Sequence, residues 1–226
     1  MSQWLAFISL FVAARRCYPN HTRLSVSFLR GDGRQSWGDF LVTSRDIFLR
    51  TLCLVAVNMF FTSAGSAQGE LVLAVNTLVM TLFTLLSYIM DGFAYAAEAL
   101  AGRFCGEGDS RGLALLHRRL SLWGAGAATA FTMAYYVGGD ALMSLLTDDT
   151  TVVSAAAEYT AFALLIPVSG VMAFVYDGIF IGLTRTKEML MSTFVGAAVF
   201  FALYFLLFSR YGNHALWTAL LCYLFL

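Results

Sequence analysis

The sequence predicts an all-α protein, a polytopic bundle of transmembrane helices, and three observations support this fold class. Apolar residues make up 59% of the chain and charged residues only 12%, whereas soluble domains carry roughly 25% charged residues. Apolar segments long enough to span a bilayer recur along the chain. The connections between them alternate between basic and non-basic. A chain this poor in charge has too little polar surface for a soluble globule.

Five apolar segments are the predicted full spans, and one partial span lies at each end of the chain. The full spans are residues 47–64, 71–101, 120–137, 159–183 and 189–209. The partial spans are residues 1–14 and 215–226, each shorter than the ~20 residues that a crossing helix needs. Arg15 and Arg16 stand where a signal peptide would have small residues, so we interpret the first segment as part of a helix. We therefore expect the chain to be a fragment.

The connecting segments predict the orientation of the helices and the domain boundaries. Residues 15–45 form an arginine-rich connector, and residues 46–226 form the main transmembrane unit. Basic residues number seven in 15–50, none in 66–70, four in 102–119 and none in 138–153. Arg185 and Lys187 follow in the next turn, and only Arg210 in the last connection. The positive-inside rule places the basic connections in the cytoplasm, as in an integral, multi-pass membrane protein.

One of the cytoplasmic connections is expected to contain a helix of its own. Residues 109–119 are predicted to form a short interfacial helix that begins after a capping residue, Asp109 or Ser110. Both residue types accept hydrogen bonds from the free N–H groups of a first helical turn.

A polar stripe runs along the second predicted span. Its members recur at spacings of three and four residues and share one helical face: Thr77, Thr81, Thr84, Tyr88, Asp91, Tyr95 and Glu98. A carboxylate inside a membrane needs a partner, an ion or water, so this face is expected to meet protein or an aqueous cavity. Asp91, Glu98, Tyr88 and Thr84 are candidate ion-coupling or substrate-binding residues. The threonines and tyrosines also suit hydrogen bonding between helices.

Further candidates lie on the fourth and first spans. Asp177 is a second carboxylate within an apolar segment, and Pro167 in the same segment predicts a kink. On the first span, Asn58 is a weaker candidate of the same kind. Arg50 follows Asp46 by four residues, which predicts a local ion pair near the membrane interface.

Motifs of enzymes and of metal sites are missing from the sequence. Asp91-Gly92 and Asp177-Gly178 match only the start of a CDP-alcohol phosphotransferase motif, and the rest of that motif does not follow. The four cysteines, Cys17, Cys53, Cys105 and Cys222, form no C-x-x-C pair and lie far from the histidines. A net charge of zero gives no reason to expect nucleic acid as a partner. We therefore predict no enzyme activity, no catalytic residue, no metal site and no cofactor.

Several segments resemble one family of membrane transporters. Asp91-Gly92-Phe93-Ala94, with the rest of 91–103 and 106–109, resembles the eighth helix of the multidrug and toxic compound extrusion (MATE) family. Segment 177–189 is similar to the end of the tenth helix of that family. Segments 47–51 and 212–217 are similar to its DNA-damage-inducible protein F subgroup. The resemblance covers nearly all of residues 45–226.

The resemblance implies a fold of twelve helices in two lobes, of which this chain would supply the C-terminal lobe. It implies a cation-coupled antiporter that exports amphipathic or cationic xenobiotics against a flow of H⁺ or Na⁺. The partners would be the organic substrate, the bilayer and the missing N-terminal lobe, and the location would be a bacterial inner (plasma) membrane. The family's usual coupling aspartate is on the first helix, which this chain lacks.

Three alternatives remain open at this point. A lipid-linked oligosaccharide flippase of the same superfamily would need cations in its cleft, and the spans contain almost none besides Arg50. An intramembrane transferase would need Asp91 and Asp177 to form part of a metal-binding cluster. The third alternative is a non-catalytic membrane subunit.

Overall fold

The computed structural model describes residues 37–226 and, before them, Ile8, Ser9, Val12 and Arg16. The chain divides into two compact units, Met1–Ser44 and Arg45–Leu226. Apart from the four isolated residues, the predicted partial span 1–14 and the connector as far as residue 36 lie outside the described residues.

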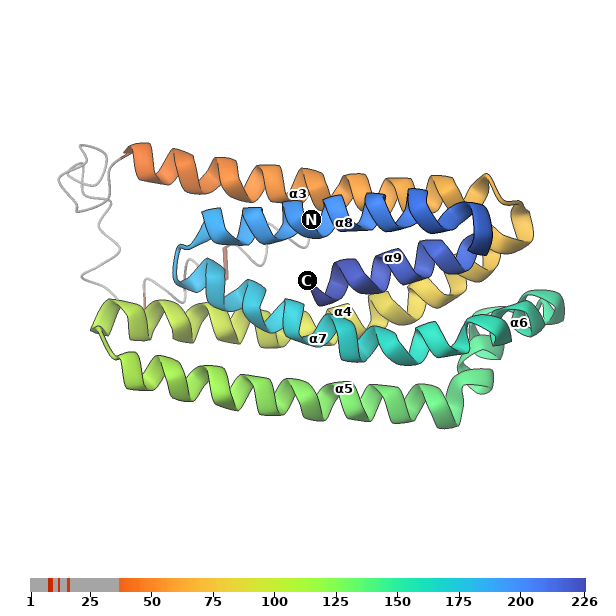
Figure 1. Ribbon diagram of the computed structural model, residues 1–226. Helices are drawn as coiled ribbons and strands as arrows, with labels where there is room; N and C mark the ends of the chain where they lie inside the picture. The colour runs from red at the N-terminus through yellow and green to blue at the C-terminus, as the bar shows by residue number, and fades with distance from the viewer. Residues whose placement is uncertain (1–7, 10–11, 13–15, 17–36) are drawn as a thin grey trace. The chain divides into compact units, whose positions relative to one another are not determined.

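From residue 37 onward the described chain is helical (Figure 1). The elements are α3 (Trp37–Ser66), α4 (Glu70–Glu107), α5 (Ser110–Leu146), α6 (Thr150–Ala156), the 3₁₀ turn η1 (Ala157–Tyr159), α7 (Thr160–Gly182), α8 (Thr186–Tyr211) and α9 (Asn213–Phe225). The predicted spans 47–64, 71–101, 159–183 and 189–209 correspond to α3, α4, α7 and α8. The partial span 215–226 corresponds to α9. The all-α fold class is therefore confirmed.

Four helices of the described chain are long and apolar enough to cross a membrane. These segments are Phe40–Ser66, Glu70–Glu107, Thr150–Gly182 and Thr186–Tyr211. Helix α5 contains the predicted span 120–137 and is 37 residues long, but its glycines, threonines and tyrosines dilute its apolar character. Four of the five predicted spans are thus supported, and the span in α5 stays a prediction.

One predicted boundary is wrong. The short interfacial helix 109–119 is not separate, because α5 continues without a break from Ser110 to Leu146. No proline or capping signal interrupts the chain near residue 119, so the first turns simply extend the helix. The cap itself is confirmed: the Asp109 carboxylate accepts from the backbone N–H groups of Arg111 and Gly112. Helix α3 begins at Trp37, inside the segment predicted as a connector.

Helix α7 packs against α4, α5 and α9, and α8 packs along α9. The core of these contacts is apolar, with Leu82, Leu86 and Met90 of α4 and Ile166 and Val175 of α7 almost fully buried. Pro167 is also buried, and α7 remains one helix through it. Since lipid is as apolar as these side chains, close packing rather than water exclusion holds such helices together.

Aromatic rings join α3 to this core. The ring of Phe60 meets those of Phe201 and Tyr204 edge-on, with centroids 5.0 and 4.9 Å apart. Phe61 packs in the same manner on Trp217 of α9, at 5.0 Å. Edge-to-face geometry is the favourable arrangement of two aromatic quadrupoles.

Two glycines let α7 approach α4 closely. A Cβ atom at Gly178 would overlap the backbone carbonyl of Ala94, and one at Gly182 would overlap the carbonyl of Glu98. Only a residue without a side chain fits at such a contact between backbones. The contact fixes the residue before Gly178, which is Asp177, beside the part of α4 that carries Asp91 and Glu98.

The connections with basic residues lie at one end of this unit. Figure 1 shows the α4–α5 and α7–α8 connections at the same end, and the α3–α4 and α8–α9 connections at the other. Arg103 and Arg185 lie near the first pair of connections, whereas residues 66–70 hold no Lys or Arg. The fold thus separates the connections as the basic alternation predicts.

We expect the basic end to face the cytoplasm. In a variant without the native cysteines, Ser110→Cys should resist a membrane-impermeant maleimide on intact cells and react after permeabilisation. Asp148→Cys, on the connection after the far end of α5, is the matched control and should react on intact cells. Efficient labelling at position 110 from outside would reverse the assigned orientation.

A buried polar network ties α4 to α9. Asn76 and Asn213 exchange two side-chain hydrogen bonds of 2.9 and 2.8 Å, and the Trp217 indole N–H donates to Asn76 at 2.8 Å. Gly65 of α3 lies so close that a Cβ there would be 2.7 Å from the Asn76 amide nitrogen. Every member of the network is satisfied, which is the condition for a stable buried polar group.

Removing the centre of this network should destabilise the fold. Asn76→Leu leaves Asn213 and the Trp217 N–H without their partner, and an unsatisfied buried group costs about 1–3 kcal/mol. We expect a lower unfolding temperature in detergent. Asn58→Leu is the control, because the exposed Asn58 amide bonds only to the carbonyl of Leu54 in its own helix. Equal melting of the two variants would contradict a stabilising role for the network.

Candidate functional site

The ion pair between Arg50 of α3 and Asp177 of α7 is the centre of the candidate site. This partner corrects the predicted local pair of Arg50 with Asp46. The Asp46 side chain is almost fully buried and bonds instead to Arg45, at 2.8 Å, and to the Thr186 hydroxyl, at 3.5 Å. The helical spacing of four was compatible with a local pair, but Asp46 faces α8 while Arg50 reaches α7.

The Arg50–Asp177 pair is partly shielded and incompletely hydrogen-bonded. The Arg50 and Asp177 side chains are 19% and 24% exposed. Nη2 of Arg50 contacts Asp177, whereas the buried Nε–H of Arg50 has no acceptor among the described residues. A buried donor without a partner lowers the stability of the fold by about 1–3 kcal/mol. A bidentate contact, in which Arg donates two parallel hydrogen bonds to a carboxylate, would avoid that loss. The guanidinium is therefore held by charge more than by fixed geometry.

Two further carboxylates lie near this pair. Asp91 and Glu98 of α4 are close enough to Asp177 for their charges to act on it, and both are half-buried. Tyr223 of α9 is also close enough to Arg50 and Asp177 for their charges to act on it. The charges that act on Asp177 are thus one guanidinium and two carboxylates, which gives the acidic cluster, Asp91, Glu98 and Asp177, an excess of negative charge. Such a surface suits a cation.

This cluster is not built like a metal centre. Among the described residues, no group of three or more His, Cys, Asp or Glu side chains is arranged to hold a metal ion. The carboxylates come from two different helices and flank the close contact between Gly178 and Ala94. A diffuse arrangement of this kind suits a monovalent or organic cation better than a tightly coordinated divalent one.

The polar stripe of α4 lies on the face that the other described helices leave uncovered. Tyr88 and Tyr95 are 73% and 70% exposed, while Leu82 and Leu86 on the opposite face are buried. The hydroxyls of Thr77, Thr81 and Thr84 donate to carbonyl groups of α4 itself. These threonines therefore form no hydrogen bond to another described helix, and the role of the stripe as a binding face stays a prediction.

The remaining candidate, Asn58, does not join the acidic cluster. Its side chain is exposed on α3, and its amide donates to the Leu54 carbonyl at 2.9 Å. Of the six candidate residues, the structure brings together Asp177, Asp91 and Glu98. Tyr88 and Thr84 belong to the same polar stripe as Asp91, but their side chains are exposed, whereas that of Asp91 is half-buried.

Sequence reasoning assigned Arg50 the wrong partner and did not name Tyr223. A signal for Arg50 was available, because a cation within an apolar span requires a carboxylate partner, and Asp177 was one of the unpartnered carboxylates on the other spans. Tyr223 has no such signal, since tyrosines are common in membrane helices.

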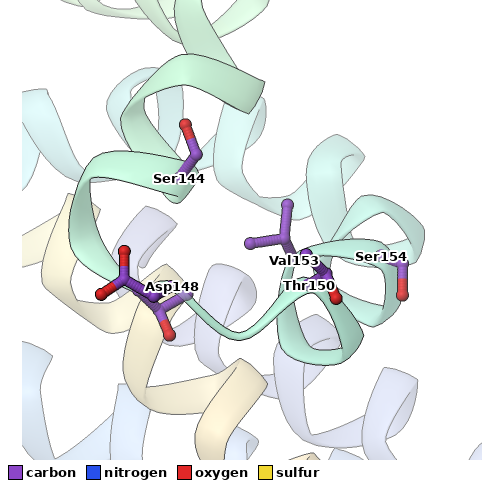
Figure 2. A pocket seen from close by; sticks show the side chains of 6 residues that line it. Ser144, Asp148, Thr150, Val153 and Ser154 are labelled. Atoms are coloured by element: carbon purple, nitrogen blue, oxygen red, sulfur yellow. The ribbon is translucent and has the colours of Figure 1, made fainter.

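A separate hollow of about 360 Å³ lies between the end of α5 and the start of α6 (Figure 2). Its lining is mostly hydroxylated: Ser144, Thr147, Asp148, Thr150, Val153 and Ser154. The adjacent Asp149 caps α6, and the backbone N–H of Thr151, followed by that of Val152, holds the pKa of its carboxyl below the usual range. The hollow shares no residue with the acidic cluster.

Comparison with known proteins places these features in one family. Residues 47–206 match the family described as MatE. Over 201 residues the chain is 37% identical to DNA damage-inducible protein F of Escherichia coli (strain K12). That alignment covers 89% of this chain and 44% of the relative. The chain thus spans less than half the length of that relative.

Proposed function

Since this chain belongs to the MatE family of transporters, we propose that it forms one lobe of a cation-coupled antiporter that exports amphipathic or cationic xenobiotics. The coupling ion in this proposal is H⁺ or Na⁺. The observation that carries it is the acidic cluster beside a single arginine, at the contact of two candidate membrane spans. The lobe would act together with the part of the transporter that this chain does not cover, and it would need no cofactor.

The chemistry of the cluster supports coupled exchange. A carboxylate in a membrane helix is stabilised by a proton, a metal cation or an organic cation, and each of these excludes the others from the same oxygens. Binding of the coupling ion therefore displaces a cationic substrate, and binding of the substrate displaces the ion. Such competition, combined with movement of one lobe against another, gives antiport.

The structure gives one reason to prefer xenobiotic export over lipid-linked oligosaccharide flipping. A flippase would need a free cation to hold a pyrophosphate. Arg50 is the basic residue within the described spans that faces the acidic cluster, and it is already paired with Asp177. Membership in a transporter family likewise favours transport over an intramembrane transferase.

Dye efflux tests the proposal in two arms. Cells that lack their own efflux pumps would express this chain alone, or together with the remaining part of the E. coli relative. We expect ethidium to leave these cells faster than vector controls, and a protonophore or a sodium ionophore to abolish the difference. The ionophore that acts identifies the coupling ion. Efflux equal to the vector in both arms would refute the proposed function.

A further inference from the structure

We propose that Arg50 is a built-in competitor for the cation site: its guanidinium occupies Asp177 when no cation is bound, and an arriving cation must displace it. This inference rests on the proposed function, which it deepens by naming how Asp177 is kept filled and how its cation is released.

The geometry of the Arg50–Asp177 ion pair suits a contact that forms and breaks. Arg50 reaches Asp177 through Nη2, while its buried Nε–H points to no acceptor. An arginine that anchors a fold normally engages a carboxylate through two parallel hydrogen bonds. The Nε–H of Arg50 gains nothing in the observed conformation. A second rotamer of Arg50, in which Nε–H donates to an acceptor, would therefore lose no hydrogen bond from this group.

The charges around the pair favour a second cation. Asp91 and Glu98 also act on Asp177, so the cluster holds three carboxylates, of which Arg50 pairs with one. When Arg50 moves aside, the cluster gains room for an incoming positive charge without adding a like-charged neighbour. When that cation leaves, Arg50 returns and prevents a bare carboxylate in the membrane.

The contacts of α3 allow such a movement. Tyr223 of α9 lies close enough to Arg50 for the guanidinium charge to act on it. Helix α3 meets its neighbours through aromatic edges rather than through a backbone contact like that of α4 and α7. A long side chain on such a helix can change rotamer without separating two backbones.

The test compares binding of tetraphenylphosphonium, a lipophilic monovalent cation, to purified variants of the whole chain in detergent. Arg50→Gln removes the competing charge and should bind the probe about tenfold more tightly than the wild type, a change of about 1.4 kcal/mol. Arg50→Lys keeps the charge and should bind like the wild type. The double variant Arg50→Gln with Asp177→Asn should lose this gain in affinity. The melting temperature of the double variant shows whether the fold remains intact without the two charges.

The binding and efflux measurements test the competition by Arg50 and the transport function separately. Tighter binding by Arg50→Gln that depends on Asp177 supports the competition. Equal, weaker or no binding by a folded Arg50→Gln variant overturns it, even if the wild type drives dye efflux, and then transport stands without the competitor. If efflux fails while Arg50→Gln gains affinity through Asp177, the transport proposal fails and the competition stands.

Discussion

Asp177→Asn is expected to lower the affinity for an exported cation by about tenfold or more and to reduce efflux accordingly. The substitution keeps the size of the side chain and removes its charge. A hydrogen bond to a charged group contributes about 1.5–3 kcal/mol, which corresponds to a factor of roughly 10 to 150 in a binding constant. Asp91→Asn should reduce efflux less, because Asp91 acts on Asp177 from α4 and the described residues give it no ion pair like that of Asp177 with Arg50. The measurement is the initial rate of ethidium efflux at matched protein levels.

The control for this prediction addresses the partner left behind. Asp177→Asn leaves the Arg50 guanidinium without its carboxylate, and an unpaired charge of this kind destabilises a fold. The double variant Asp177→Asn with Arg50→Gln removes both charges, so it should recover the melting temperature but not the efflux. Asp148→Asn, in the separate hollow beside α6, should retain efflux. Normal efflux from both Asp177→Asn and Asp91→Asn would exclude these residues from the mechanism.

Gly178→Ala is expected to destabilise the fold by about 3 kcal/mol, near the upper end for overpacking a tight interface. The new methyl group would overlap the Ala94 backbone carbonyl. A carbonyl within a helix cannot turn aside as a flexible side chain can, so α4 and α7 must separate. That separation also moves Asp177 away from Asp91 and Glu98, and efflux should fall with stability. The measurement is the melting temperature of the purified protein in detergent.

Gly92→Ala provides a matched control for the same chemical change. A Cβ atom at Gly92 meets no other atom within 4 Å, and alanine is favoured over glycine within a helix by about 1 kcal/mol. Gly92→Ala should therefore leave the melting temperature unchanged or raise it. If the melting temperature of Gly178→Ala equals that of Gly92→Ala, the close contact of α4 with α7 does not stabilise this part of the fold.

The helices themselves followed from local sequence patterns. The apolar segments placed α4, α7 and α8 within several residues of their observed bounds, and α3 only at its C-terminal end, because length and hydropathy are properties of each segment alone. The three-four spacing also identified the polar face of α4, with Leu82 and Leu86 on the buried side. The Asp109 cap was predictable for the same reason, since its acceptors and donors lie within one turn. The break assumed before residue 120 was wrong because no local signal supported it.

Tertiary structure decided which of these faces meet. Arg50 had two partners compatible with its position, one turn away on α3 or on a distant helix, and the rotation of α3 selected Asp177 over Asp46. The pairing of Asn76 with Asn213 joins residues 137 positions apart, and no periodicity within either helix contains that information. Nothing in the sequence of α7 distinguishes Gly178 and Gly182 from other small residues. Only the packing of α7 on α4 shows that a side chain at either position would overlap a backbone carbonyl. A single chain's spacing fixes the face that a residue occupies on its helix, whereas the relative rotation and translation of packed helices determine what stands opposite that face.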